Sequence, residues 1–264
     1  MKYGFIGLGN MAKAMIGGMI KKELVKPDQI IGSCKTKETA KTVKETFGIC
    51  TTLDNSEVAR EADILVLAIK PQFFPEVLPQ IRDMVKADAL IISIAAGKTI
   101  AYIEEVFDRP IKLVRCMPNV AALVGEGCTS VSGNERVSAS ELEQTISLMS
   151  CFGKAIEVSE RLIDAVVGVS GSSPAYVFIF IEAMADAAVN AGMPRKQAYE
   201  FAAQAVLGSA KMVLETGMHP GALKDMVCSP GGTTIAAVKV LEEKGMRAAV
   251  MDAVEACIEK SKSL

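Results

Sequence analysis

Two glycines and two threonines stand directly before a helical pattern in the stretch CSPGGTTIAAVKVLEE, residues 228–243. The apolar residues Ile235, Val238 and Leu241 recur at helical spacing, which predicts a helix that begins near Thr234. The first N–H groups of such a helix lack partners and carry the positive end of its dipole, and glycines leave room for a ligand. The stretch therefore predicts a site for a small anion, with a plain turn and a threonine N-cap as the alternative.

A second chemical pattern lies at the N-terminus, in GFIGLGNMAKAM, where Gly7, Gly9 and Ala12 form a GxGxxA motif between a β-type run and a helical pattern. In this motif the first glycine makes a tight turn, the second lets a pyrophosphate approach the backbone, and the alanine allows helix and strand to pack closely. Its place inside a βαβ unit predicts dinucleotide binding and disfavours an ordinary βα turn.

The end of the second predicted strand indicates which dinucleotide is bound. A free ribose 2′-hydroxyl is usually held there by Asp or Glu, and the first acid after this strand is Glu38. The hydroxyl groups nearby, with Lys35 and Lys37, suit a 2′-phosphate instead. NADPH is therefore favoured over NADH, although either lysine is also explained as a solvated surface charge.

Residues 1–115 alternate short β-type runs with amphipathic helical patterns. Strands are predicted at residues 3–6, 29–33, 64–68, 90–95 and 111–115, and helices at 9–22 and 37–47. This alternation predicts an α/β fold with a Rossmann-like, doubly wound parallel sheet covered by helices on both faces. The residues that follow two of the strands, 68–71 and 95–97, are expected to line the nicotinamide half of the cofactor, the main chain of Lys70 more than its amine.

Beyond residue 157 the strand patterns stop and helical patterns follow one another, at residues 160–167, 174–191, 195–214, 220–227, 234–244 and 246–260. We therefore predict a dinucleotide-binding domain at residues 1–157 and an all-helical substrate and dimerisation domain at residues 158–264. The helix from Pro174 is apolar on most of its circumference, so a subunit interface is expected to cover it.

The bulk properties exclude several classes of function. A net charge of -2 and a pI near 5.7 argue against an electrostatic partnership with nucleic acid. The longest apolar runs fall short of the roughly 18 residues that span a membrane, and the N-terminus lacks a signal-peptide pattern, so a cytoplasmic protein is expected. Seven scattered cysteines without a CxxC pair indicate reduced thiols and no metal site.

Two further groups are assigned structural roles. The single histidine, His219, precedes Pro-Gly and is expected to cap a helix or stand in a loop. Glu182 and Asp186 lie four residues apart without a third ligand at suitable spacing, so a solvated or interface-paired face is expected in place of a metal.

The start of the helical region also bears on the chemistry. β-Hydroxyacid dehydrogenases carry a catalytic lysine in a GxxGxGxxxK pattern, whereas GVSGSSPAYV has Val177 at that position. Alcohol oxidation that needs an amine is therefore disfavoured. The positively charged C=N group of a protonated imine accepts hydride readily. An enzyme that reduces it has mainly to orient this group and to hold the other end of the substrate. Amides of Gly232, Thr233 and Thr234 are expected to grip a substrate carboxylate, and the Thr234 hydroxyl to reach the imine nitrogen.

Taken together, the motifs resemble the Δ1-pyrroline-5-carboxylate reductase family from end to end. The resemblance rests on GFIGLGNMAKAM, AIKPQ, MPN at 117–119, SGSSPAYVF and HPGALKDMVCSPGGTTIAAVKVLE. It implies reduction of 1-pyrroline-5-carboxylate to L-proline with NADPH or NADH, the last step of proline biosynthesis. It also implies interlocked dimers, which in this family often assemble into decamers, with each site completed near the dimer interface.

The resemblance also implies roles for individual residues. Cofactor contacts are expected from Ile6, Gly7, Leu8, Gly9, Asn10, Met11, Ser33, Cys34, Asn55, Ala68, Ile69, Lys70, Pro71, Ala95, Ala96 and Gly97. Substrate contacts are expected from Gly231, Gly232, Thr233, Thr234 and Glu160, with Thr234 as the catalytic residue. Without the resemblance, Glu160 is more simply a charge at a helix start.

Three positions depart from some relatives, and two other functions stay open. Met226 stands where some relatives have Asn, Thr233 where others have a small apolar residue, and Cys34 where some have a hydroxyl. The alternatives are an imine reductase for six-membered or open-chain analogues, and a dinucleotide-sensing module without turnover.

Overall fold

The computed structural model describes residues 1–263 and divides into two compact units. Unit 1 comprises Met1–Gly171 together with the chain from Cys257 onward, and unit 2 comprises Ser172–Ala256. These units are defined by which residues contact one another. They do not test the predicted boundary between the two functional domains at residues 157 and 158.

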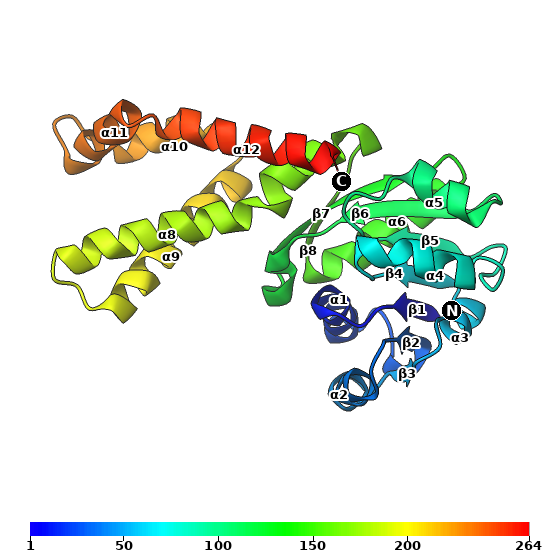
Figure 1. Cartoon of the computed structure of the whole chain (residues 1–264). Helices are drawn as coiled ribbons and strands as arrows, with labels where there is room; N and C mark the ends of the chain where they lie inside the picture. Colours follow the sequence, from blue (N-terminus) through cyan, green and yellow to red (C-terminus); the bar gives the residue numbers. More distant parts are fainter. Residues whose placement is uncertain (264) are drawn as a thin grey trace. The chain divides into compact units, whose positions relative to one another are not determined.

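Unit 1 is built on one eight-stranded sheet in the order β3-β2-β1-β4-β5-β6-β7-β8 (Figure 1). Its strands are β1 Tyr3–Ile6, β2 Ile30–Ser33, β3 Cys50–Thr52, β4 Ile64–Leu67, β5 Leu90–Ser93, β6 Lys112–Met117, β7 Gly127–Gly133 and β8 Gly153–Glu157. Every neighbouring pair is parallel except β6 and β7. Because Ile6 pairs with both Ser33 and Leu67, and Leu67 with Ser93, the carboxyl ends of four strands are level.

Helices cover both faces of this sheet, as predicted. They are α1 Asn10–Lys21, α2 Lys37–Phe47, α3 Asn55–Glu61, α4 Phe74–Ile81, α5 Ile100–Phe107, α6 Ala139–Met149 and the short α7 Ile163–Val166. One buried cluster joins α1 and α6 to one face of the sheet, and a second joins α3, α4 and α5 to the other. The doubly wound α/β prediction is therefore confirmed.

Three strands, β3, β7 and β8, were not predicted. β3 is only three residues long and half exposed, and β8 (GKAIE) is partly exposed along its length. β7 (GCTSVSG) is largely buried but rich in small polar residues, and it runs antiparallel to β6. Such segments lack a continuous apolar pattern, and only their packing in the sheet makes them strands.

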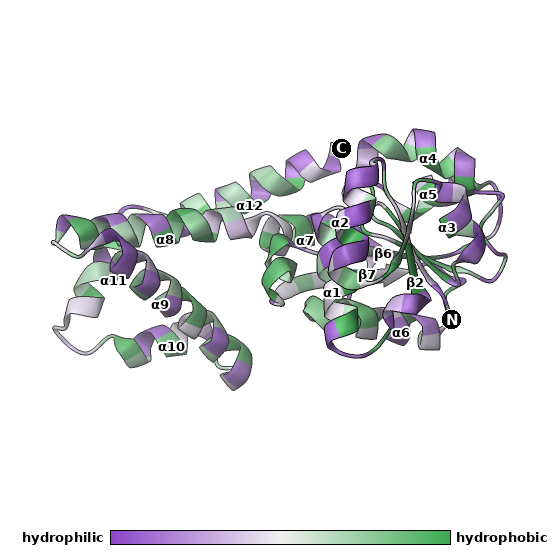
Figure 2. Cartoon of the chain, turned by 90° about the horizontal axis from the view of Figure 1, so that it is seen from below, coloured by the Kyte–Doolittle hydropathy of each residue, from purple (hydrophilic) through white to green (hydrophobic). Residues whose placement is uncertain are grey.

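Unit 2 is helical, as predicted. Its helices are α8 Ser173–Asn190, α9 Arg195–Thr216, α10 Pro220–Val227, α11 Thr233–Glu243 and α12 Met246–Lys262, whose last residues belong to unit 1. Its buried hydrophobic residues within the described chain are only Ala185, Ala198, Ala202 and Leu223. Figure 2 shows hydrophobic residues along much of α8 and α9, and Phe178, Ile179, Phe201 and Leu214 are more than 60% exposed. The chain alone does not cover this surface.

One segment, Glu160–Asn190, is long and apolar enough to cross a membrane by length and composition, and 11% of its most apolar window is buried. A single segment of this kind is weak evidence for a membrane span. The exposed apolar side chains of α8 fit equally the subunit interface that the sequence predicts.

His219 caps a helix, as predicted. It is the N-cap residue of α10, and its Nδ1 accepts a hydrogen bond from the Gly221 amide at 3.0 Å. We expect His219→Ala to lower the free energy of unfolding by about 1 kcal/mol, because one N-terminal amide of α10 loses its acceptor. His219→Asn, which can cap the same amide, should restore most of that loss.

Denaturant unfolding of the three proteins, with kcat measured alongside, checks this role. A large fall in kcat for His219→Asn at unchanged stability would contradict it and indicate acid–base chemistry.

Candidate active site

The turn between β1 and α1 holds two glycines for different reasons. Gly7 has φ +97°, its amide donates to the Ser33 carbonyl at 3.0 Å, and a Cβ there would lie 2.6 Å from the Ala68 carbonyl oxygen. The fold itself therefore requires glycine at this position. Gly9 is the N-cap of α1 with φ -76°, and a Cβ there would meet nothing within 4 Å. The fold itself would therefore accept a side chain at Gly9, and the glycine leaves open space next to the start of α1.

Backbone donors face that space. The amides of Asn10 and Met11, at the start of α1, have no hydrogen-bond partner within residues 1–263. Free amides at the positive end of a 12-residue helix suit a phosphate group. The turn thus fits the pyrophosphate of a dinucleotide by both its shape and its donors.

A cavity of about 320 Å³ lies at the carboxyl ends of β1, β2 and β4. It gathers nine of the expected cofactor residues: Gly7, Leu8, Gly9, Ser33, Cys34, Asn55, Ala68, Ile69 and Lys70. Asn10, Met11, Pro71, Ala95, Ala96 and Gly97 do not line this cavity, and neither does Ile6, whose side chain is fully buried. Any contact from Ile6 must therefore come from its backbone, whose carbonyl already accepts the Ala68 amide at 2.8 Å.

The end of the cavity where adenosine contacts are expected contains a pair of hydrogen-bonded polar side chains. The buried Ser33 hydroxyl donates to Asn55 Oδ1 at 2.7 Å, which joins two of the expected contacts. Burial raises the pKa of the Cys34 thiol, so this group stays neutral and does not repel a phosphate. Lys35 Nζ lies 3.7 Å from the centre of the Phe73 ring, which steadies the ammonium group at the cavity wall.

Four lining residues were not predicted from the sequence: Thr39, Leu53, Phe73 and Val77. Phe73 follows the AIKPQ motif directly, and an aromatic residue after that turn is the one signal that could have indicated it. The main chain of Lys70 forms part of the turn after β4, because its carbonyl accepts the Phe73 amide at 2.9 Å. Its side chain is exposed.

The expected nicotinamide residues leave the sheet at a common edge. Ala68 follows β4 and Ala95 follows β5, and these two strands are parallel and in register at their carboxyl ends. Gly97 has φ +68°, so the second of these loops turns sharply after β5. In open parallel sheets this edge is where ligands bind.

The start of α11 differs from its prediction in one respect. Gly231 has φ +69°, and the Gly232 amide donates to the Ser229 carbonyl at 3.0 Å, so that amide is not free to grip a carboxylate. A Cβ at Gly232 would lie 2.4 Å from Ser229 Oγ, which explains this glycine by the turn itself. The helix begins at Thr233, one residue earlier than expected.

Two of the expected donors, the amides of Thr233 and Thr234, are free, and the Ile235 amide takes the place of Gly232. The N–H groups of Thr233, Thr234 and Ile235, and the Thr234 hydroxyl, have no hydrogen-bond partner within residues 1–263. They open an 11-residue helix whose first turn contains no acidic residue. The arrangement can therefore bind a carboxylate through its amides and place one hydroxyl beside it.

Glu160 has structural partners from two other elements. Its Oε1 accepts the Ile100 amide at 2.8 Å, at the start of α5, and lies 2.9 Å from Nη1 of Arg115. The Arg115 side chain is 7% exposed and the Glu160 side chain 32%. The carboxylate thus neutralises a buried guanidinium and caps α5. Its expected contact with substrate stays a prediction.

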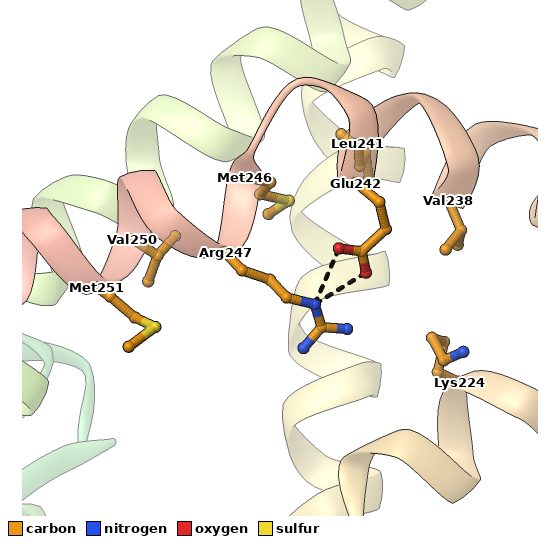
Figure 3. A pocket seen from close by; sticks show the side chains of 8 residues that line it. All are labelled: Lys224, Val238, Leu241, Glu242, Met246, Arg247, Val250 and Met251. Carbon is orange, nitrogen blue, oxygen red and sulfur yellow. Dashed lines mark hydrogen bonds and ion pairs between the residues drawn. The ribbon is translucent and has the colours of Figure 1, made fainter.

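A separate apolar groove of about 480 Å³ lies in unit 2 between α10, α11 and α12 (Figure 3). It is lined by Lys224, Val238, Leu241, Glu242, Met246, Arg247, Val250 and Met251. At its rim Arg247 Nε donates to Glu242 Oε1 at 2.8 Å, an exposed pair of small energetic value. None of the expected substrate residues lines this groove.

The part of the chain that the structure describes contains no group of three His, Cys, Asp or Glu residues placed to hold a metal. Asp186, one of the two acids considered above, pairs with Arg195.

Comparison with known proteins gives two family matches. Residues 2–97 match the family described as NADP oxidoreductase, coenzyme F420-dependent, and residues 160–264 match pyrroline-5-carboxylate reductase dimerisation. The pyrroline-5-carboxylate reductase of Escherichia coli K12 is 54% identical over all of this chain and 98% of its own length. That of Methanosarcina acetivorans is 46% identical over 100% of this chain and 97% of its own.

Solved structures agree. A pyrroline-5-carboxylate reductase from Coxiella burnetii superposes with a TM-score of 0.94 at 36% identity, covering 99% of this chain and 97% of its own. The Plasmodium falciparum pyrroline carboxylate reductase, solved with NADP bound, has a TM-score of 0.89 at 33% identity, covering 100% and 97%. A prephenate dehydrogenase from Aquifex aeolicus, at 14% identity and a TM-score of 0.56, shares the fold alone.

Proposed function

This chain belongs to the pyrroline-5-carboxylate reductase family, and from that premise we propose which of its residues carry the reaction. It is an NAD(P)H-dependent oxidoreductase that acts on a C=N group and reduces 1-pyrroline-5-carboxylate to L-proline, the last step of proline biosynthesis. The observation that carries the residue assignment is the set of three free amides and one free hydroxyl at the start of α11.

The amides of Thr233, Thr234 and Ile235 hold the substrate carboxylate. Each charge-assisted hydrogen bond of this kind contributes about 1.5–3 kcal/mol, enough for two or three to fix the ring in one orientation. The carboxylate sits next to the ring nitrogen in this substrate, so the Thr234 hydroxyl reaches that nitrogen and accepts the iminium N–H. The hydroxyl thereby orients the C=N bond.

NADPH, when bound, supplies a hydride from C4 of its nicotinamide to the C=N carbon, and the π electrons of that bond move to nitrogen, which gives the amine and NADP⁺. The chain's own part is to bind the cofactor and the substrate and to hold them in the reactive orientation. The open space at Gly9 and the free Asn10 and Met11 amides hold the pyrophosphate. Ser33 binds near the adenosine ribose and Asn55 binds the adenosine portion of the cofactor, and Lys35, which lines the cavity, suits a 2′-phosphate.

Initial rates with NADPH and with NADH over the same cyclic imine test the function directly. We expect oxidation of NADPH that depends on 1-pyrroline-5-carboxylate, at a higher kcat/KM than for a six-membered cyclic imine, since one methylene is worth about 1–3 kcal/mol in a pocket. NADPH binding without imine-dependent oxidation would reject the reductase in favour of a sensing module. A preference for the six-membered ring would reject this substrate.

A second copy of the chain covers the exposed apolar surface of unit 2, and we propose that the groove of Figure 3 is part of that contact. The groove lies wholly within the residues that match the dimerisation family. Leu241, Val250 and Met251, at 43%, 49% and 61% exposure, are too exposed for a monomer's core. We also propose that the dimers assemble further into a decamer and that the protein is cytoplasmic.

We expect Met251→Glu to shift the protein from dimer toward monomer, because the contact would bury an unpaired carboxylate. Met84→Glu is the matched control, since Met84 is an exposed methionine of unit 1, at 38% exposure, outside the dimerisation residues. Sedimentation analysis over a concentration series gives the mass of each species, including any decamer. A Met251→Glu protein as associated as the Met84→Glu protein would remove the groove from the interface.

A further inference from the structure

The side chain of Asn119 ties together three segments at the end of β6. Asn119 ends the MPN motif and is 9% exposed. Its Nδ2 donates to the Ser170 carbonyl at 2.9 Å, and its Oδ1 accepts the Cys128 amide at 3.0 Å. One buried amide therefore connects the exit of β6, the entry of β7 and the segment that precedes α8.

The segment it holds has an unusual backbone. Val167–Gly171 is a π-helical stretch, in which the wider turn breaks the regular pattern of helix hydrogen bonds. Such stretches are rare and occur often at functional sites. The π turn also lies against the end of β6, because a Cβ added at Gly171 would be 3.5 Å from Met117 Cε. Asn119 thus fixes the position of this turn relative to Met117.

The end of β6 lies beside the expected nicotinamide residues. β6 is parallel to β5, and Ser93 is in register with Arg115, so residues 117–119 leave the sheet at the same edge as residues 95–97. The mechanism above does not use Asn119, although its MPN motif is one of those on which the family resemblance rests.

We propose that Asn119 is a positioning residue for hydride transfer: its two hydrogen bonds hold the β6 exit and the π turn as a rigid wall at the nicotinamide edge of the sheet. This inference rests on the proposed function. Asn119 contacts neither the reacting atoms nor the substrate in this role. It acts through the Met117 segment, and a displacement of about 1 Å near a reacting centre can lower a rate by about 10²-fold.

The chain offers a matched control in Asn134. Its Nδ2 donates to Glu104 Oε1 at 2.7 Å and to the Ile111 carbonyl at 2.9 Å, and its Oδ1 accepts the Leu113 amide at 3.2 Å. Asn134 therefore joins α5 to the start of β6, the end of that strand opposite to Asn119. Loss of its side chain costs stability without disturbing the nicotinamide edge.

The test compares Asn119→Ala, Asn119→Asp and Asn134→Ala with the native protein. Asp keeps the acceptor for the Cys128 amide but loses the donor to Ser170. For both Asn119 variants we expect kcat to fall by about 10-fold or more, with a larger deuterium isotope effect from NADPH labelled at the transferred hydrogen and little change in the Kd for NADPH. Asn134→Ala should lower the melting temperature with an unchanged isotope effect.

Amide hydrogen exchange gives a readout that does not depend on turnover. Faster exchange of the Cys128 amide is expected in Asn119→Ala, and retained protection in Asn119→Asp. The proposal would be overturned if the Asn119 variants had the same isotope effect and kcat as Asn134→Ala. If Asn119→Ala does not fold, the result for Asn119→Asp decides the test. Absence of imine reduction by the native protein would instead reject the proposed function.

Discussion

Replacement of Thr234 by alanine is expected to lower kcat for 1-pyrroline-5-carboxylate by about 10²-fold while the Kd for NADPH stays nearly unchanged. The Thr234 hydroxyl has no hydrogen-bond partner within the described chain, which leaves it available to the ring nitrogen. Alanine removes that oxygen but keeps the backbone amide. The substrate carboxylate therefore still binds, and the loss falls on the orientation of the C=N bond.

Stability is not expected to explain the loss. The N-cap of α11 is Gly232, which caps without a side chain, so the Thr234 hydroxyl does not contribute to the helix start. A substitution at such a half-exposed position usually changes the free energy of unfolding by less than about 0.5 kcal/mol. Unfolding midpoints of the two proteins should therefore coincide closely.

Two neighbouring variants serve as controls. Thr234→Ser keeps the hydroxyl and should retain most of kcat. Thr233→Ala keeps the Thr233 amide that holds the carboxylate, so it should leave kcat and KM close to the native values. Steady-state kinetics with NADPH titrated separately by fluorescence give the required split. Equal weakening of kcat and of NADPH affinity by Thr234→Ala would count against the place of Thr234 at the reacting nitrogen.

Local signals explain which elements the sequence predicts well. The bounds of α2 agree because Thr36 caps it and Gly48, with φ +70°, ends it. The bounds of α10 agree because His219 and Pro220 mark its start. Both ends of α2 and the start of α10 are thus encoded by residues that are neighbours in sequence. β7 has no such signal, since its polar residues become buried only through pairing with β6 and β8.

The same distinction applies to the site. The β1–α1 turn, and the places of Ser33 and Asn55, follow from short motifs and from the topology of a parallel sheet. The Arg115–Glu160 pair joins residues that are far apart in sequence, and no local sequence pattern predicts it. The occupied Gly232 amide likewise depends on how the turn at Ser229 closes. Motifs indicate where donors lie, while the folded backbone decides which of them are free.

Substitutions at Gly7 and Gly9 are expected to separate folding from cofactor binding. Gly7→Ala should lower the free energy of unfolding by about 1–3 kcal/mol from backbone strain, because φ +97° disfavours a side chain and its Cβ would press on the Ala68 carbonyl. Gly9→Val should cost less than about 1 kcal/mol, since φ -76° is ordinary and the side chain enters open space.

The order reverses for NADPH. The valine side chain of Gly9→Val occupies the space through which a pyrophosphate approaches the free Asn10 and Met11 amides. Loss of two charge-assisted hydrogen bonds of about 1.5–3 kcal/mol each lowers affinity by about 10²-fold or more. Gly9→Ala adds only one methyl group and should give a Kd for NADPH between those of the native protein and Gly9→Val. The Kd should therefore rise with the volume of the side chain at this position.

Fluorescence titration of NADPH and denaturant unfolding of each variant check both halves of this prediction. A Gly9→Val protein that binds NADPH as tightly as the native one would place the pyrophosphate elsewhere, because the valine side chain fills the approach to the Asn10 and Met11 amides. A Gly7→Ala protein of native stability would show that the turn relaxes around the Ala68 carbonyl. Only the first result bears on the cofactor site, since the second concerns the fold that carries it.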